Sequence, residues 1–208
     1  DGATQDENDA EMRDIESFGG TMNLYVIPDI TSITREKIAS YQKRGHTISV
    51  HPNLTGAAGE SPENQLAEAD RQMRSFQEKF DVPMRTLRNH SYMWPGYVEL
   101  PELWEQWGVG MDANVTAVLR GQSRDFGPFA NLHAALPLPY VREDGRVIDV
   151  YQQPTQLNDD LICQPASPKS HKYALGEFRR MVERIFDDAI QVTHAPICVN
   201  FHPGNYAK

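Results

Sequence analysis

The sequence lacks a long apolar run, is short of positive charge and has only two cysteines. No stretch approaches the ~18 consecutive apolar residues typical of a membrane-spanning helix, so we predict no membrane span. The formal net charge of -9 argues against a nucleic-acid partner held by phosphate contacts. Cys163 and Cys198 do not have the CxxC spacing of a cysteine zinc site, and a disulfide between them is left open.

What is present is the composition of a soluble globular domain, with 39% apolar and 24% charged residues among 208. The length suffices for one domain with a substantial core. The chain starts at Asp1 without an initiator methionine and stops two residues after Tyr206. We therefore expect a single domain, residues 1–208, that is incomplete at both ends, and the absence of a targeting segment carries no weight.

Strand and helix patterns alternate along the chain. Helical spacing predicts helices over 34–43, 62–80, 101–107 and 175–189, and apolar runs predict strands over 22–27, 46–51, 85–89, 109–112 and 196–201. Residues 1–20 indicate a loop or short helix, and Asp144-Gly145 predicts a hairpin turn. The alternation predicts an α/β fold with a mostly parallel sheet and helices outside it. The less regular residues 116–160 are then an insertion or a substrate-binding lobe.

Three histidines follow predicted strands where the chain turns away: His51, His90 and His202. The carboxyl ends of parallel strands are where α/β proteins carry their chemistry. Neutral imidazole is also the commonest side-chain metal ligand, and it titrates near neutral pH. One such histidine alone is more often a surface or hydrogen-bonded loop residue, but three at similar strand ends indicate a metal or acid/base site. His46 starts its strand and is expected to be structural.

A second dense cluster runs from Arg88 to Tyr97 and combines a guanidinium, an imidazole and three aromatic side chains. Aromatic faces beside polar groups suit sugar rings, so Trp94 and Tyr97 are candidate substrate-binding residues. The competing interpretation is that both cap the core beneath the loop. Asp112 ends a predicted strand and is a third candidate, which either orients an arginine or histidine or caps the next turn.

The order of these segments resembles the polysaccharide deacetylase family, the NodB-homology carbohydrate esterases, over most of the chain. The segment Gly45-His46-Thr47-Ile48-Ser49-Val50-His51 is similar to the family's Gly-His-Glu-Ile-Gly-x-His stretch. Arg88-Asn89-His90 stands where the family's arginine motif belongs, and Phe201-His202 stands where its Leu-His pair belongs. Asp1-Gly2 resembles the tail of its Asp-Asp-Gly motif, with the first Asp cut off. The resemblance implies a distorted (β/α) barrel with mostly parallel strands.

One position departs from the family's pattern. The resemblance places a second metal histidine at position 55, where this chain has Thr55. His90 is not a usual feature of the arginine motif and could replace the missing ligand, so the implied metal ligands are Asp1, His51 and His90. The Asp that supplies the general base is expected directly before Asp1.

The resemblance implies a hydrolase that removes N-acetyl or O-acetyl groups from a carbohydrate with a divalent metal, zinc first, with cobalt or nickel as alternatives. The metal would polarise the acetyl carbonyl and lower the pKa of its bound water toward ~7. His202 would be the catalytic acid that protonates the leaving group, and Arg88 would orient the base or contact the substrate. An extracellular or periplasmic location is implied in the same way, and the cytoplasm is left open.

Two other interpretations stay open. A deacetylase-like barrel that has lost its metal and only binds carbohydrate is favoured by Thr55. A glycoside hydrolase on a similar barrel would need two carboxylates ~5–10 Å apart, and the sequence offers no convincing pair at strand ends. Asp159-Asp160 is interpreted as a solvated turn.

Overall fold

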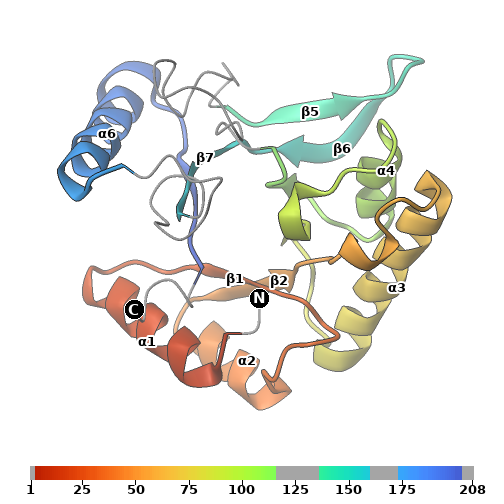
Figure 1. Ribbon diagram of the computed structural model, residues 1–208, viewed down its shortest axis with the longest axis horizontal. Coiled ribbons are helices and arrows are strands. Elements are labelled where there is room, and N and C mark those ends of the chain that lie inside the picture. The colour runs from red at the N-terminus through yellow and green to blue at the C-terminus, as the bar shows by residue number, and fades with distance from the viewer. Residues whose placement is uncertain (1–2, 116–135, 160–172, 203–208) are drawn as a thin grey trace. The chain divides into compact units, whose positions relative to one another are not determined.

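The computed structural model describes residues 3–115, 136–159 and 173–202, and the chain divides into two compact units (Figure 1). The first unit comprises Asp1–Asp112 and Pro139–Tyr151, and the second comprises Ala113–Leu138 and Gln152–Tyr206. Each unit has its own apolar cluster, which in the second unit consists of the buried Leu157 and partly buried side chains around it.

A six-stranded sheet forms the centre of the first unit. Its strands, in spatial order, are β1 (Asn23–Val26), β2 (Thr47–Val50), β3 (Thr86–Leu87), β4 (Met111–Asp112), β6 (Val147–Gln152) and β5 (Leu138–Val141). The first four strands are parallel, so their carboxyl ends meet at one edge of the sheet. The turn between β5 and β6 contains Gly145 with a φ of 84°, which confirms the predicted hairpin.

Helices cover one face of this sheet (Figure 1). They are α1 (Gln5–Ser17), α2 (Arg35–Lys43), α3 (Pro62–Phe80) and α4 (Glu99–Gln106). Their apolar side chains share one core with alternate strand residues such as Leu24 and Val50. Side chains alternate along a strand, so the intervening residues point to the other face. There the hydroxyl of Thr86 is hydrogen-bonded to those of Tyr25 and Ser49, which gives the sheet a polar face opposite its apolar one.

The second unit contains a two-stranded parallel sheet of β7 (Thr155–Asn158) and β8 (Cys198–Asn200). Helix α6 (Leu175–Asp188) and a π-helical turn (Ala189–Thr193) lie between these strands in the sequence. Leu157 is buried against apolar side chains of α6, among them Phe178 and Met181. The sequence predicts α6 and β8, but β7 lies in the stretch expected to be irregular.

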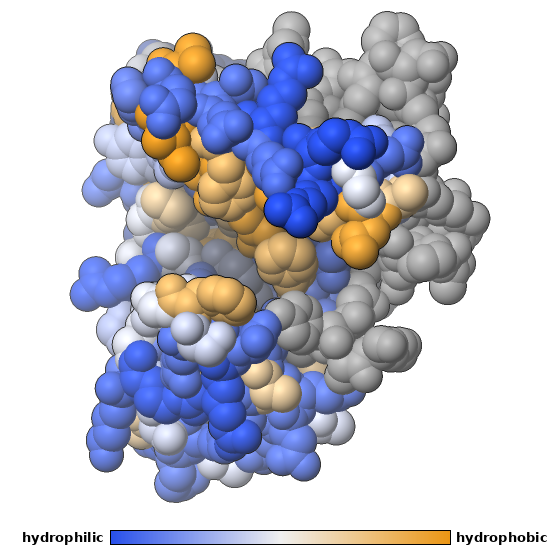
Figure 2. Space-filling model, turned by 90° about the vertical axis from the view of Figure 1, so that its left-hand side faces the viewer, coloured by the Kyte–Doolittle hydropathy of each residue, from blue (hydrophilic) through white to orange (hydrophobic). Residues whose placement is uncertain are grey.

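The α/β class with a mostly parallel sheet is confirmed. Across the described residues the strands form two separate sheets, and they do not close into the barrel that the family resemblance implies. In the same residues, no helix is both long and apolar enough to cross a bilayer. The face drawn in Figure 2 is mostly hydrophilic with scattered apolar patches, in keeping with the net charge of -9.

An ion-pair cluster ties α1 to the start of β2. Glu16 of α1 accepts hydrogen bonds from the Arg44 guanidinium (2.6 and 2.9 Å) and lies 2.7 Å from Nε2 of His46. The Nδ1 atom of His46 accepts the backbone N–H of Met22 (3.1 Å), so the ring proton is on Nε2 and is donated to Glu16. The buried His46 ring thus links helix α1 to the segment before β1, which agrees with the structural role expected for it.

Glu16→Gln is expected to lower the thermal midpoint at neutral pH, and this deficit should vanish in acid. Hydrogen bonds from Arg44, and next from His46, lower the pKa of Glu16 from 4.5 to about 2. A depressed carboxyl pKa stabilises the fold above the unfolded value, and the contribution is lost as the pH falls from 4.5 toward 2. Thermal unfolding followed by circular dichroism measures the effect, with Glu78→Gln, an exposed residue of α3, as the matched control. A deficit that persists undiminished in acid would contradict this role of Glu16.

Candidate active site

The candidate site of the first unit lies at the carboxyl edge of its parallel strands. His51 follows β2 directly, and its backbone N–H donates to the Val26 carbonyl of β1 (2.8 Å). Arg88 follows β3, and the N–H of His90 donates to the carbonyl of Pro52 (2.8 Å). Backbone pairing therefore continues past the strand ends and brings the His51 and His90 segments together.

The protonation of His51 follows from its hydrogen bond. Its Nδ1 atom lies 2.6 Å from the backbone carbonyl of Arg88, and because a carbonyl only accepts, Nδ1 carries the proton. The lone pair of the neutral ring is then on Nε2. Burial lowers the pKa of His51 to about 3, although the hydrogen bond to Arg88 acts in the opposite direction. The ring is therefore neutral near physiological pH, which is the form that binds metals.

His90 lies beside His51. The centroids of the two rings are 5.5 Å apart, and the rings meet edge to face at 80°. Asp1, the third predicted ligand, lies outside the described residues. In the ranges that the structure does describe, no group of three or more His, Cys, Asp or Glu side chains is arranged to hold a metal ion. The ligand set of Asp1, His51 and His90 thus stays a prediction.

Thr55 occupies the position at which the family has a second metal histidine. It begins a 3₁₀ helix (Thr55–Ala57) and is exposed. Its backbone N–H (3.1 Å) and its hydroxyl (2.6 Å) both donate to the side-chain oxygen of Asn53. These bonds make Thr55 part of a local turn, and they give its hydroxyl a structural partner within the loop.

Arg88 is buried, with 3% of its surface exposed. Its carbonyl accepts the proton of His51, and its guanidinium lies 5.3 Å from the ring centroid of Tyr25 and 6.0 Å from that of Tyr92. Arg88 therefore contacts both a candidate metal ligand and two aromatic side chains.

A histidine–carboxylate pair stands at the carboxyl edge of the sheet in the second unit. His202 comes shortly after β8, and Asp159 directly follows β7. Nδ1 of His202 lies 2.7 Å from one carboxylate oxygen of Asp159, and the backbone N–H of His202 donates to the other (2.9 Å). The carboxylate only accepts, so the proton of the neutral ring is on Nδ1 and Nε2 is its basic nitrogen. Asp159 was interpreted from sequence as part of a solvated turn, and its place beside a strand end is the signal that could have revealed it.

The three predicted substrate-binding residues have different surroundings. Trp94 packs edge to face on Trp104, with 5.4 Å between centroids, and its Nε1 donates to the Tyr97 carbonyl (3.1 Å). Asp112 is fully buried and accepts the hydroxyl proton of Tyr140 on β5. Tyr97 is 63% exposed. Trp94 and Asp112 therefore support the core and the sheet, while Tyr97 presents its ring to solvent, and the substrate-binding roles stay predictions.

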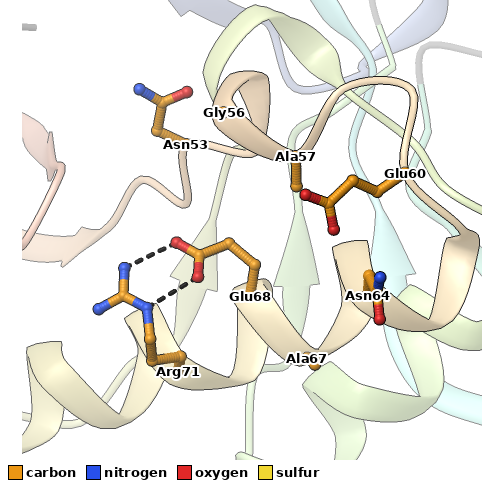
Figure 3. Close-up of a pocket in the computed structure, with 8 residues that line it drawn as sticks. All are labelled: Asn53, Gly56, Ala57, Glu60, Asn64, Ala67, Glu68 and Arg71. Atoms are coloured by element: carbon orange, nitrogen blue, oxygen red, sulfur yellow. Dashed lines mark hydrogen bonds and ion pairs between the residues drawn. The ribbon is translucent and has the colours of Figure 1, made fainter.

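A pocket of about 410 Å³ lies between the loop after His51 and helix α3 (Figure 3). Its lining includes Asn53 on the loop side and Asn64 and Glu68 on the helix side. The Glu68 carboxylate accepts from Arg71 at 2.6 Å, as the dashed lines of Figure 3 show. Amide and carboxylate groups of this kind can hydrogen-bond a polar ligand, and none of these residues is predicted from the sequence.

Comparison with known proteins finds a similarity of fold. No family model and no curated protein matches the chain in sequence. The fold is similar to that of a solved structure from Mycobacterium smegmatis described as a "putative polysaccharide deacetylase", with a TM-score of 0.64 and 16% sequence identity. The match covers 95% of this chain and 63% of that chain, so this chain spans less than two thirds of its neighbour's length. At this identity the similarity shows the fold alone.

Proposed function

We propose that this chain is part of a metal-dependent carbohydrate deacetylase, which hydrolyses an acetyl amide or acetyl ester on a sugar. The observation that carries the proposal is His51, a buried neutral imidazole at the carboxyl end of β2 whose Nδ1 proton is donated to a backbone carbonyl. Metal-binding histidines almost always make this second hydrogen bond, which orients the ring and fixes its tautomer. The structural similarity to the protein from M. smegmatis supports the same class.

We propose a divalent metal as the cofactor, zinc first and cobalt or nickel as alternatives, and the donor types of His51 and His90 support it because imidazole nitrogen is a common ligand of these ions. His51 would bind it through Nε2, and His90 and Asp1 would complete the set, since imidazole nitrogen and carboxylate oxygen are zinc ligands and a catalytic site uses about three of them. When bound, the ion would supply a water of lowered pKa and polarise the acetyl carbonyl.

The chain's own residues would move the proton and orient the reacting groups. The family resemblance gives His202 the role of general acid, which would donate a proton from Nε2 to the leaving amine or alkoxide. Asp159 accepts from Nδ1, so it holds the ring and stabilises its charged form. Arg88 would orient the general base or contact the substrate, and Tyr97 would offer its exposed ring to a sugar.

Acetate release from N-acetylated chitooligosaccharides and from acetylated xylan tests the proposal. Protein that extends upstream of Asp1 is the form to assay, with its metal content measured by elemental mass spectrometry. We expect acetate release with zinc, cobalt or nickel, loss of activity after EDTA, and recovery when the metal is restored. If that form neither retains metal nor releases acetate, the hydrolase proposal is wrong.

A metal-free carbohydrate-binding protein on the same fold is the second candidate. Thr55 favours it, because this exposed side chain is engaged with Asn53 where the family has a metal ligand. Titration calorimetry with the same oligosaccharides separates the two candidates. Binding that is unaffected by EDTA and is accompanied by no acetate release would support the binding protein.

A further inference from the structure

Two tyrosine rings flank the guanidinium of Arg88. Tyr25 comes from β1 and lies 5.3 Å from the guanidinium carbon, and Tyr92 comes from the turn after β3 and lies 6.0 Å away. Both distances are within the range at which an aromatic face attracts a cation, and the attraction strengthens when the cation is removed from water. Arg88 meets that condition because only 3% of its surface is exposed.

Tyr25 does not belong to the helix-covered core. Its neighbours in the strand, Leu24 and Val26, point into that core, so the Tyr25 ring lies on the polar face of the sheet. Its hydroxyl donates to Oγ1 of Thr86 (3.2 Å), which also accepts from the Asn23 amide (2.5 Å). The far end of the ring is thereby anchored to β3, the strand that Arg88 follows.

The Thr86 hydroxyl also has a defined direction. Its oxygen has two lone pairs, and two donors use them, so its own proton points to Oγ of Ser49 (3.1 Å). This chain of hydroxyls crosses β1, β2 and β3 on the polar face. It fixes the position of Tyr25 relative to the strands that carry His51 and Arg88.

Tyr92 reaches Arg88 through a strained turn. Ser91 and Tyr92 both have a φ of 55°, the left-handed region that side chains other than glycine rarely adopt. The turn is held by bonds from the Tyr92 N–H to the Asn89 carbonyl (3.1 Å) and from the Asn89 amide to the Met93 carbonyl (2.8 Å). Two consecutive strained residues persist only where the surroundings impose them, and such strain clusters at functional sites.

We propose that Tyr25 and Tyr92 form an aromatic clamp on Arg88 and act as positioning residues for the His51 site. By fixing Arg88, the clamp fixes the carbonyl that accepts the Nδ1 proton of His51, and so holds the His51 ring in orientation. The inference rests on the proposed function for its catalytic consequence, while the clamp itself is a physical arrangement that can be tested without turnover.

The test compares Tyr25→Leu and Tyr92→Leu with the matched Phe variants, which keep the ring and remove only the hydroxyl. The first readout is the Nε–Hε signal of Arg88 in ¹H–¹⁵N NMR spectra. Nearby aromatic rings shift this signal, and the Hε proton exchanges with water more slowly when the guanidinium is held in place. The second is the kinetics of acetate release. We expect the Leu variants to lose the displaced signal and to lower kcat about tenfold at nearly unchanged KM. Tyr92→Phe should resemble the wild type, and Tyr25→Phe, which keeps its ring but loses the bond to Thr86, should fall between the wild type and Tyr25→Leu.

Phe80→Leu is the control for a merely structural effect, since Phe80 is buried in the core next to Phe76 and away from the clamp. It should lower the thermal midpoint without moving the Arg88 signal. If the Leu variants leave the Arg88 signal in place, or change it no more than Phe80→Leu does, the clamp is overturned. If the wild type shows no acetate release, the proposed function fails, and the NMR comparison alone then decides for or against the clamp.

Discussion

His51→Ala is expected to abolish metal binding and acetate release together. The imidazole is buried, neutral and presented at a strand end with its tautomer fixed, so under the proposed function alanine removes one of the three predicted ligands. Loss of an outer-shell partner typically costs about 10–100-fold in metal affinity or activity, and loss of the ligand itself should cost more. Metal content and kcat/KM, measured on the same preparation, check the prediction.

His46→Ala is the matched control, because His46 is a second buried histidine at the opposite end of the same strand. It should lower the thermal midpoint through loss of its bonds to Met22 and Glu16, yet keep metal content and kcat. His90→Ala tests the predicted ligand set, because a second ligand should be needed as much as His51. It should therefore lose metal and acetate release as His51→Ala does. Retention of metal and activity by His51→Ala would remove the basis of the proposed function.

The sequence predicts elements best where local signals agree with tertiary packing. Helix α3 begins at Pro62 after the cap Ser61 and ends at Phe80, as the cap and the apolar spacing predict, and Ala69, Met73 and Phe76 are buried.

Helix α1 is longer than the acidic composition of residues 1–20 suggests. Its capping box of Thr4 and Glu7 is a local signal, but its buried residues include Asn8, Asp9 and Glu11, so an apolar pattern alone does not reveal its inner face.

Strand β7 and the pairing of Asp159 show what a local pattern cannot supply. The strand has four residues, with Leu157 as its one strongly apolar residue, and its partner β8 lies about 40 residues further on. Asp159 meets His202 only because these two strands are parallel and the residue before Asp159, Asn158, pairs with Asn200 of β8. From sequence alone, an Asp-Asp pair in a polar stretch is more simply read as a turn.

The candidate site is predicted in part for the same reason. Three strand-end histidines are visible in the sequence, and parallel pairing brings His51 and His90 together. The bond that orients His51 goes to a backbone carbonyl, which has no side-chain signature. The clamp on Arg88 depends on positive φ angles at Ser91 and Tyr92, residues that do not usually adopt them. Both features follow from tertiary structure, and the sequence does not indicate them.

His202→Ala is expected to lower kcat by about 10²–10⁴, the usual worth of a general acid. Asp159→Asn should lower it by part of that factor. The carboxylate accepts both the ring proton and the backbone N–H of His202, and an amide with one accepting oxygen cannot serve both bonds. Because the two residues act as a unit, the double variant should be no slower than His202→Ala. Steady-state kinetics on the acetylated oligosaccharides measure all three.

Substrates with different leaving groups distinguish proton donation by His202 from a role in binding or folding. A sugar amine or alkoxide needs a proton as it departs, whereas a nitrophenolate does not. The His202→Ala variant should therefore hydrolyse 4-nitrophenyl acetate with a much smaller loss of rate than it shows on the acetylated oligosaccharides. His194→Ala, an exposed histidine of the second unit, is the matched control and should leave both rates unchanged. An equal loss on both substrates would assign His202 to binding or to folding, and a fully active Asp159→Asn would mean that the carboxylate only ties the backbone after β8. If His202 is a proton donor held by Asp159, the rate loss in both the His202 and the Asp159 variants should be larger for the acetylated sugar than for 4-nitrophenyl acetate.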